Sequence, residues 1–379
     1  MPEMLTQSQL KLKADIVGFI AESLVPLEHK LEAGEDAKAI REQVIAASTD
    51  SGFFSMTQPA AYSGKEVSAL ELTIVREALG AANLNVAAHV FGPGPGVLAN
   101  AMGPLKDEYL DPVMSGEKRG SFGFTEPDTA PRPTWAVQDG EELVVTGQKS
   151  FVTGGGNADF VNALVNVEAD GVNKGGTALV VIDLDAAGLT VDKEFRTLEG
   201  SDHLAIRFDD VRVPKWHVIG NIGEGMPRAL EDISKVRLSL SAVACGYMQW
   251  AVDFVTDALK KPHRTGTPMA DREGVRIRYA DMRIDTFAAR SMLYRTARMV
   301  DSDQNDVNEV MCTKVFCTEA AGQVIDTAVQ LMGGNALTAG HPLERLYRQV
   351  RSMRFTEGAS DILRINIAKG KFNLEKGTL

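Results

Sequence analysis

Glu357 lies between two stretches of helical character, where a carboxylate would be held in place rather than move freely. A basic run that ends at Arg354 stops before Phe355, and a second, apolar-periodic run begins at Ser360. A carboxylate fixed in such a corner can act as a general base. The ordinary alternative is a solvated surface charge, which is what most of the 51 acidic residues must be.

Two other segments suit a flat heterocyclic ligand. The stretch "GSFGFTEPDTA" (120–130) ends a short predicted strand with a hydroxyl and backbone N–H groups. The stretch "GQKSFVTGGGNADF" (147–160) continues a strand into an aromatic residue, a threonine and three glycines. Such groups can hold the edge of a ring, and glycine lets the backbone approach it closely. The plain alternatives are a proline turn for the first stretch and a hairpin tip for the second.

A third segment, "QLMGG" (330–334), ends a predicted helix. Gly333 and Gly334 fit a helix C-cap, where glycine follows the last turn. The same glycines also expose backbone to which a phosphate could bind.

The elements that must position these residues follow from the hydrophobic period. Residues 5–118 are predicted to be helical, with helices over Leu10–Lys30, Ala37–Thr49, Ala69–Ala82, 86–102 and Lys106–Met114. Between 119 and 224 the period changes to two, and the Asp-Gly of "VQDGEELVV" indicates a hairpin. After Gly225 the helical period returns, over 226–260, 274–301, 306–333, 342–354 and 360–373.

The predicted fold class is therefore α+β and multidomain. It comprises an N-terminal α-helical domain (1–118), a middle antiparallel β domain (119–225) and a C-terminal α-helical bundle (226–379). The two helical parts are expected to pack together as one bundle with the β module on its flank. Ala242, Ala244 and Gly246 have the spacing that allows close helix packing.

Composition excludes several functions. A net charge of −11 argues against nucleic acid as a partner. The three cysteines form no CxxC pair and no histidine has metal-ligand spacing, so no metal site is expected, and His203, His217, His263 and His341 are expected at the surface or at helix caps. With no apolar run of membrane length and no visible N-terminal signal, we expect a cytoplasmic protein without membrane insertion.

Six motifs in order give the chain a resemblance to the acyl-CoA dehydrogenase family. They are "FTEP", "KSFVT", "DDVRVP" with "GEG", the arginine of "SKVR", "QLMGG" with "ERLYR", and "EGASDI". The resemblance covers nearly the whole chain. It implies helical, β and four-helix domains in that order, FAD as the cofactor, and a homotetramer (or homodimer) as the usual assembly.

The resemblance also implies roles for particular residues. Glu357 matches the catalytic base of the commonest subgroup, and Arg237 and Gly358 match substrate-binding positions. Some relatives place the base just before the matching arginine, but Val236 stands there and cannot accept a proton. The implied FAD-binding residues are Phe122, Phe124, Thr125, Phe151, Val152, Thr153, Arg264, Gln330, Gly333, Gly334, Ala359 and Asp361, with the 330–334 group meeting the flavin of a neighbouring subunit.

The implied reaction is α,β-dehydrogenation of an acyl thioester. Glu357 takes the α-proton, its backbone N–H and a flavin hydroxyl stabilise the enolate oxygen, and flavin N5 accepts the β-hydride. Burial of Glu357 beneath the substrate is expected to raise its pKa. An electron-transferring flavoprotein is the electron acceptor that the resemblance implies.

Several positions depart from the family pattern. After "TEP", Pro131 and Arg132 replace the usual serine and acid, Ala359 replaces a threonine, and Gln349 an aspartate. The thioester carrier could therefore be CoA or an acyl-carrier protein, with Arg132 meeting a phosphate. Two other functions remain open: a flavin monooxygenase or oxidase on the same fold, and an inactive binding protein.

Overall fold

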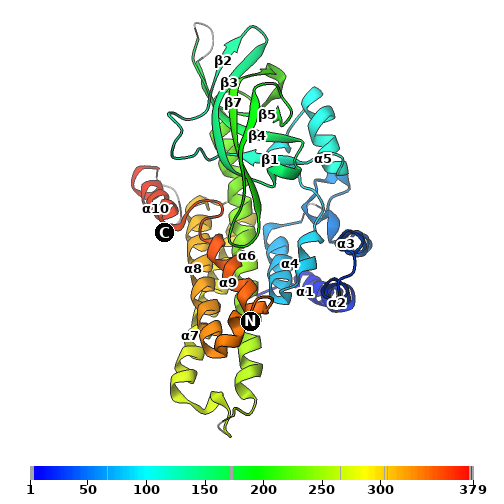
Figure 1. Cartoon of the computed structure of the whole chain (residues 1–379), viewed down its shortest axis with the longest axis vertical. Coiled ribbons are helices and arrows are strands. Elements are labelled where there is room, and N and C mark those ends of the chain that lie inside the picture. The colour runs from blue at the N-terminus through cyan, green and yellow to red at the C-terminus, as the bar shows by residue number, and fades with distance from the viewer. Residues whose placement is uncertain are drawn as a thin grey trace. The chain divides into compact units, whose positions relative to one another are not determined.

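The computed structural model describes residues 4–65, 67–170, 174–264, 266–302, 304, 306–374 and 377. These residues form two compact units (Figure 1). The helical unit comprises Met1–Thr57, Lys65–Gly92 and Ser234–Leu379, and the sheet unit comprises Gln58–Gly64 and Pro93–Ile233. The prediction that the N-terminal and C-terminal helices pack together is confirmed, while residues 93–118 group with the sheet.

The N-terminal helices begin at clear caps. They are α1 (Gln7–Phe19), α2 (Val25–Glu32), α3 (Ala37–Ser51) and α4 (Ala69–Ala82), and capping boxes at Thr6 and Ser68 start α1 and α4. The predicted helix Leu10–Lys30 is helical throughout but passes through a π-helical turn, η1 (Ile20–Leu24). Pro26 has no N–H to donate four residues back, and the wider turn accommodates this loss.

The helix predicted over 86–102 is wrong. Only two short 3-10 segments form there, η4 (Asn85–His89) and η5 (Gly96–Leu98). The "GPGPG" sequence at 92–96 explains the difference, because glycine and proline both oppose helix continuation. The next predicted helix forms as a π-helical turn, η6 (Lys106–Leu110), followed by α5 (Asp111–Ser115).

The sheet unit is built on eight strands, in the order β6-β7-β3-β2-β4-β5-β8, with β1 paired to β4. The strands are β1 (Gly120–Gly123), β2 (Trp135–Asp139), β3 (Glu142–Thr153), β4 (Phe160–Val167), β5 (Gly176–Asp183), β6 (Leu189–Arg196), β7 (Asp202–Pro214) and β8 (Val218–Ile219). The predicted β2–β3 hairpin is confirmed, with Asp139 opposite Glu142.

The sheet is mostly antiparallel, as predicted, but two of its pairings are parallel. β4 runs parallel to both β1 and β2. The chain reverses once between β2 and β3 and again between β3 and β4, so β4 regains the direction of β2. One face of the sheet buries valines and isoleucines among themselves, and the other packs against Leu98, Leu105 and Tyr109.

The C-terminal helices match the predicted ranges closely. They are α6 (Gly225–Lys260), α7 (Glu273–Asp301), α8 (Val307–Met332), α9 (Pro342–Met353) and α10 (Ser360–Leu374). In the helical unit α7 lies alongside α8 (Figure 1). A Cβ built on Gly246 would lie 2.3 Å from the carbonyl oxygen of Glu77, so α4 and α6 meet backbone to backbone, as the small residues predict.

Helix α6 also has the length and composition of a membrane span. An 18-residue window within it has a mean hydropathy of 1.2, but 56% of this window is buried inside the protein. The apolar character of α6 is therefore that of a core helix.

Candidate active site

Glu357 lies in a tight corner between α9 and α10. Ser360 N–H donates to the carbonyl oxygen of Arg354 at 3.0 Å, which closes the turn. Glu357 has a φ of 57° and Gly358 a φ of 105°, so two consecutive residues adopt left-handed backbone. Glycine tolerates this conformation, whereas for glutamate it costs roughly 1–3 kcal/mol and needs support from its surroundings.

Two buried cations supply that support from neighbouring helices. Arg237 on α6 donates from Nε to the carbonyl oxygen of Glu357 at 2.9 Å. Lys314 on α8 donates from Nζ to the carbonyl oxygens of Gly358 at 2.7 Å and Arg354 at 3.2 Å. The side chain of Arg237 is 8% exposed and that of Lys314 is 0% exposed. The structure thus brings together Glu357, Gly358 and Arg237 of the predicted site.

Lys314 was missed by the sequence analysis. It stands in an apolar stretch of α8, "VMCTKVFC", and the helical period places it on the same buried face as Met311 and Thr318. A lysine on an apolar helix face is the signal that could have revealed it.

The electrostatics of the corner are dominated by desolvation. Burial lowers the pKa of Lys314 to about 8, and the positive charge of Arg237 acts in the same direction, while Glu357 and Glu319 oppose it. Burial also lowers the pKa of Arg237, and Glu357 opposes this shift. The charge of Glu357 therefore lies close enough to both cations to be felt by each.

In the sheet unit, the two segments predicted to bind a heterocycle lie side by side. Ser150 N–H donates to the carbonyl oxygen of Thr125 at 2.9 Å. Lys149, almost fully buried, donates from Nζ to the carbonyl oxygen of Phe124 at 3.1 Å and forms an ion pair with Glu126. These contacts fix the end of β1 against the end of β3.

Phe151 and its neighbours present an open aromatic surface. Phe151 has a φ of 56°, is 59% exposed, and contacts the rings of Phe195 and His203 with centroids 5.3 and 5.8 Å away. An exposed aromatic residue held in left-handed backbone is uncommon and indicates a functional constraint. Val152 points the other way and is buried.

A hydroxyl group lies beside this surface, and further aromatic rings lie at the end of β1. The Thr153 hydroxyl lies 3.2 Å from Nδ1 of His203. The Phe122 and Phe124 rings pair at 5.9 Å, and Thr125 is exposed. Aromatic faces with adjacent hydroxyls and backbone amides are the groups that a flavin ring needs, so these residues fit FAD.

The histidine prediction requires a correction. His203 and His217 are buried, not at the surface. His203 lies between Thr153 and Thr197, and His217 bonds the carbonyl oxygen of Val181 at 2.8 Å. Hydrogen bonds to these partners in the sheet unit offset the desolvation cost of burying the two imidazoles. His341 caps α9, as predicted.

The remaining predicted cofactor residues are dispersed through the helical unit. Gln330, Gly333 and Gly334 are exposed at the C-terminal end of α8, where Gly333 is the cap. Arg264 is exposed in the connection between α6 and α7. Asp361 is exposed on the first turn of α10, next to half-buried Ala359.

Arg132, predicted to meet a substrate phosphate, already has partners. Its guanidinium lies 2.8 Å from Glu168 and 4.3 Å from the Trp135 ring centroid. The ion pair is exposed, so exchanging it for a phosphate would cost little. A small cavity of about 90 Å³ lies beside it.

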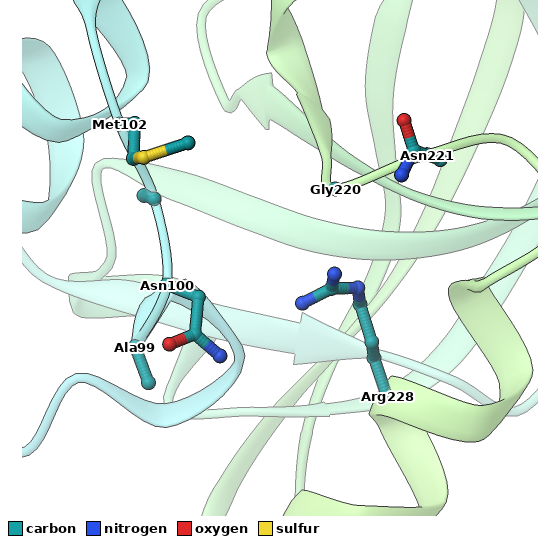
Figure 2. Close-up of a pocket in the computed structure, with 7 residues that line it drawn as sticks. Ala99, Asn100, Met102, Gly220, Asn221 and Arg228 are labelled. Atoms are coloured by element: carbon teal, nitrogen blue, oxygen red, sulfur yellow. The ribbon is translucent and has the colours of Figure 1, made fainter.

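Another cavity lies elsewhere in the sheet unit. It has a volume of about 550 Å³ and is lined by residues 99–102, Gly220, Asn221 and Arg228. In Figure 2 the Arg228 guanidinium points into the space between these two loops. Glu224 accepts hydrogen bonds from this guanidinium at 2.9 and 3.2 Å. The cavity contains no predicted site residue and no candidate base, so it is not the candidate active site.

Comparisons with known proteins cover both units. Three family models match in order: "Acyl-CoA dehydrogenase, N-terminal domain" over residues 6–117, "Acyl-CoA dehydrogenase, middle domain" over 121–211 and "Acyl-CoA dehydrogenase, C-terminal domain" over 223–372. The chain is similar to the probable acyl-CoA dehydrogenase YngJ of Bacillus subtilis, with 28% identity over 96% of this chain and 98% of that protein.

Two further similarities are informative. The caffeyl-CoA reductase-Etf complex subunit CarC of Acetobacterium woodii is 26% identical over 89% of this chain and 92% of its own length. The crystal structure of a probable acyl-CoA dehydrogenase from Mycobacterium abscessus superposes with a TM-score of 0.80 at 27% identity, covering 96% of this chain and 98% of that one. The predicted fold class is thereby confirmed.

Proposed function

Since the chain belongs to the acyl-CoA dehydrogenase family, we propose that it desaturates an acyl-CoA thioester between Cα and Cβ, with Glu357 as the base. The family is FAD-dependent and its members are oxidoreductases that act on CH–CH bonds, so the class of enzyme and the cofactor follow from membership. The substrate and the residue roles are the proposal.

One observation carries this proposal. Glu357 is held in a left-handed corner by two cations that bond its own carbonyl and the next one. Structures retain such strain where geometry matters to function. Val236, on the exposed face of α6, has no group that can accept a proton.

The chemistry assigned to Glu357 is proton removal. Its carboxylate takes the α-proton, and the electron pair of the broken C–H bond moves toward the thioester carbonyl, whose developing negative charge needs prearranged donors. FAD, when bound, supplies the acceptor for the hydride that leaves Cβ. We assign its ring to Phe122, Phe124, Thr125, Phe151, Val152 and Thr153, with Arg264, Ala359 and Asp361 as further FAD-binding residues. Gln330, Gly333 and Gly334 would contact the adenosine diphosphate end of a flavin held by a neighbouring subunit.

The names of similar proteins and one exposed apolar surface support proposals for the thioester carrier and the partners. CoA is favoured over an acyl-carrier protein because the similar proteins are named for CoA thioesters. The Etf in the name of the CarC relative supports an electron-transferring flavoprotein as the acceptor. Exposed Ile284 and Phe287, one turn apart on α7, support a homo-oligomer.

An oxidase or monooxygenase on the same fold is the second candidate. Structures titled "PigA with FAD and proline" and "FAD complex of PigA" share this fold at 22% identity, which supports the fold alone. Direct oxygen chemistry does not need a carboxylate base that is held in place like Glu357. The dehydrogenase is therefore favoured.

An anaerobic titration tests the proposal. Acyl-CoA thioesters of several chain lengths are added to the FAD-loaded protein and the flavin absorbance is followed. We expect the flavin absorbance of the parent to bleach without oxygen, and that of Glu357→Gln not to bleach on the same timescale. Glu344→Gln, a matched change on α9, should bleach normally. If the parent protein instead turns over only with oxygen and a reductant, the result would support an oxidase or monooxygenase.

A further inference from the structure

Lys314 is a buried cation whose close contacts are backbone carbonyls. Its side chain is 0% exposed, and Nζ donates to the carbonyl oxygens of Gly358 and Arg354 at 2.7 and 3.2 Å. These two carbonyls stand on either side of Glu357. Desolvating an ammonium is costly, and a methionine would fill the same space without that cost. The position therefore has a reason beyond packing.

The charges that face Lys314 come from every element around the corner. Arg237 on α6, Arg354 at the end of α9 and the carboxylates of Glu357 and Glu319 all act on it. Glu319, five residues further along α8, forms ion pairs with Arg364 of α10 at 2.6 Å and with Arg354 at 3.7 Å. The nearby carboxylate of α8 is thus engaged by arginines, which leaves the ammonium to the carbonyls.

We propose that Lys314 is a positioning residue for proton transfer, whose ammonium fixes the backbone on both sides of Glu357 and thereby the direction of its carboxylate. The proposal rests on the proposed function of Glu357. Arg237 orients the carbonyl of Glu357 and Lys314 orients that of Gly358. With both peptide planes held, the left-handed pair cannot relax toward a less strained conformation.

The protonation state of Lys314 makes this role visible. Because burial lowers its pKa to about 8, the ammonium becomes a neutral amine within an accessible pH range. Hydrogen bonds from a charged donor are roughly twice as strong as those from a neutral one, so the hold on the corner weakens. Loss of the charge also makes Glu357 a stronger base, which opposes the effect. A displacement of about 1 Å costs roughly 10²-fold in rate, so geometry should win.

The test compares the parent with Lys314→Met, which keeps the length and removes the donors. Arg345→Met is the matched control, because Arg345 on α9 also holds a carbonyl, that of Asn83, at another junction of the same unit. Flavin reduction at saturating thioester is measured by stopped flow from pH 6 to 9.5. The parent rate should fall through a midpoint near 8. Flavin reduction in Lys314→Met should be about 10²-fold slower than in the parent. Its rate should show no fall near pH 8, and its KM should change little.

A second readout does not require turnover. Deuterium exchange of amides in 354–360 should be faster in Lys314→Met than in the parent and the Arg345→Met control. Unchanged exchange and an unchanged alkaline limb in Lys314→Met would overturn the inference, as would a parent rate that rises through the same midpoint. A parent protein that never bleaches would instead reject the proposed function. If the parent never bleaches but amide exchange is still faster in Lys314→Met, Lys314 stabilises the backbone of the corner and has no role in proton transfer.

Discussion

Nε of Arg237 lies 2.9 Å from the carbonyl oxygen of Glu357, across 120 residues of chain. The bond ties α6 to the corner between α9 and α10. Because Arg237 is almost fully buried, neither group can exchange this bond for water. The geometry of the proposed base is thus set by helices distant in sequence.

Arg237→Lys should slow flavin reduction by about 10²-fold, because a lysine amine cannot occupy the place of Nε with the same direction. Bound FAD should remain, as shown by its visible spectrum. Equal rates in the parent and this variant would mean that the Arg237 bond does not orient Glu357.

Glu357→Asp withdraws the carboxylate by one methylene while keeping its charge. We expect a fall of about 10²-fold or more in the limiting rate of flavin reduction, with thioester affinity retained. Stopped-flow traces at several thioester concentrations separate the two quantities. A fall in affinity alone would place Glu357 in binding rather than in proton transfer.

Phe151→Ala should weaken FAD binding by about 1–3 kcal/mol, the range for ring stacking on an aromatic side chain. The same change should alter the stability of the FAD-free protein by less than about 0.5 kcal/mol, since the side chain is 59% exposed. Fluorescence titration with FAD and thermal unfolding measure the two effects. Phe195→Ala, which changes the ring that contacts Phe151 edge to face, serves as the comparison.

Gly246→Ala should destabilise the helical unit by about 1–3 kcal/mol or more. The added Cβ would lie 2.3 Å from the Glu77 carbonyl oxygen, and backbone cannot rotate away as a side chain can. Gly322→Ala on α8 is the control, because a Cβ there meets nothing within 4 Å. Denaturant unfolding of the two variants should differ clearly.

The stability of the protein should also depend on Lys314 at alkaline pH. Its pKa is about 8 in the folded protein and higher in the unfolded chain, so the unfolded state binds more protons between these values. The free energy of unfolding of the parent should therefore rise relative to Lys314→Met as pH increases from about 8 to about 10.4. Below pH 8 the difference should be constant. As the pH rises, the free energy of unfolding should therefore increase while the rate of flavin reduction falls. A loss of rate at alkaline pH is then not explained by unfolding.

Local sequence signals predicted most of the elements. The strands of the β module and the five C-terminal helices follow from hydrophobic period and from turn residues, which act over a few residues. The helix predicted over 86–102 did not form because the glycines and prolines at 92–96 oppose a helix more strongly than the small residues around them favour one. The π-helical turn η1 has a local signal in Pro26, which the prediction of one continuous helix did not take into account.

By itself the sequence determined the order of helical and β segments, which depends on residue types at short spacing. It also carries the motifs whose resemblance to the family implies Glu357 as the base. Only the tertiary structure decided that Lys314 and Arg237 hold the Glu357 corner and that the imidazole of His203 lies within hydrogen-bond distance of the Thr153 hydroxyl. Those contacts join residues tens to more than a hundred positions apart, and no local pattern encodes which distant carbonyl a buried cation will meet.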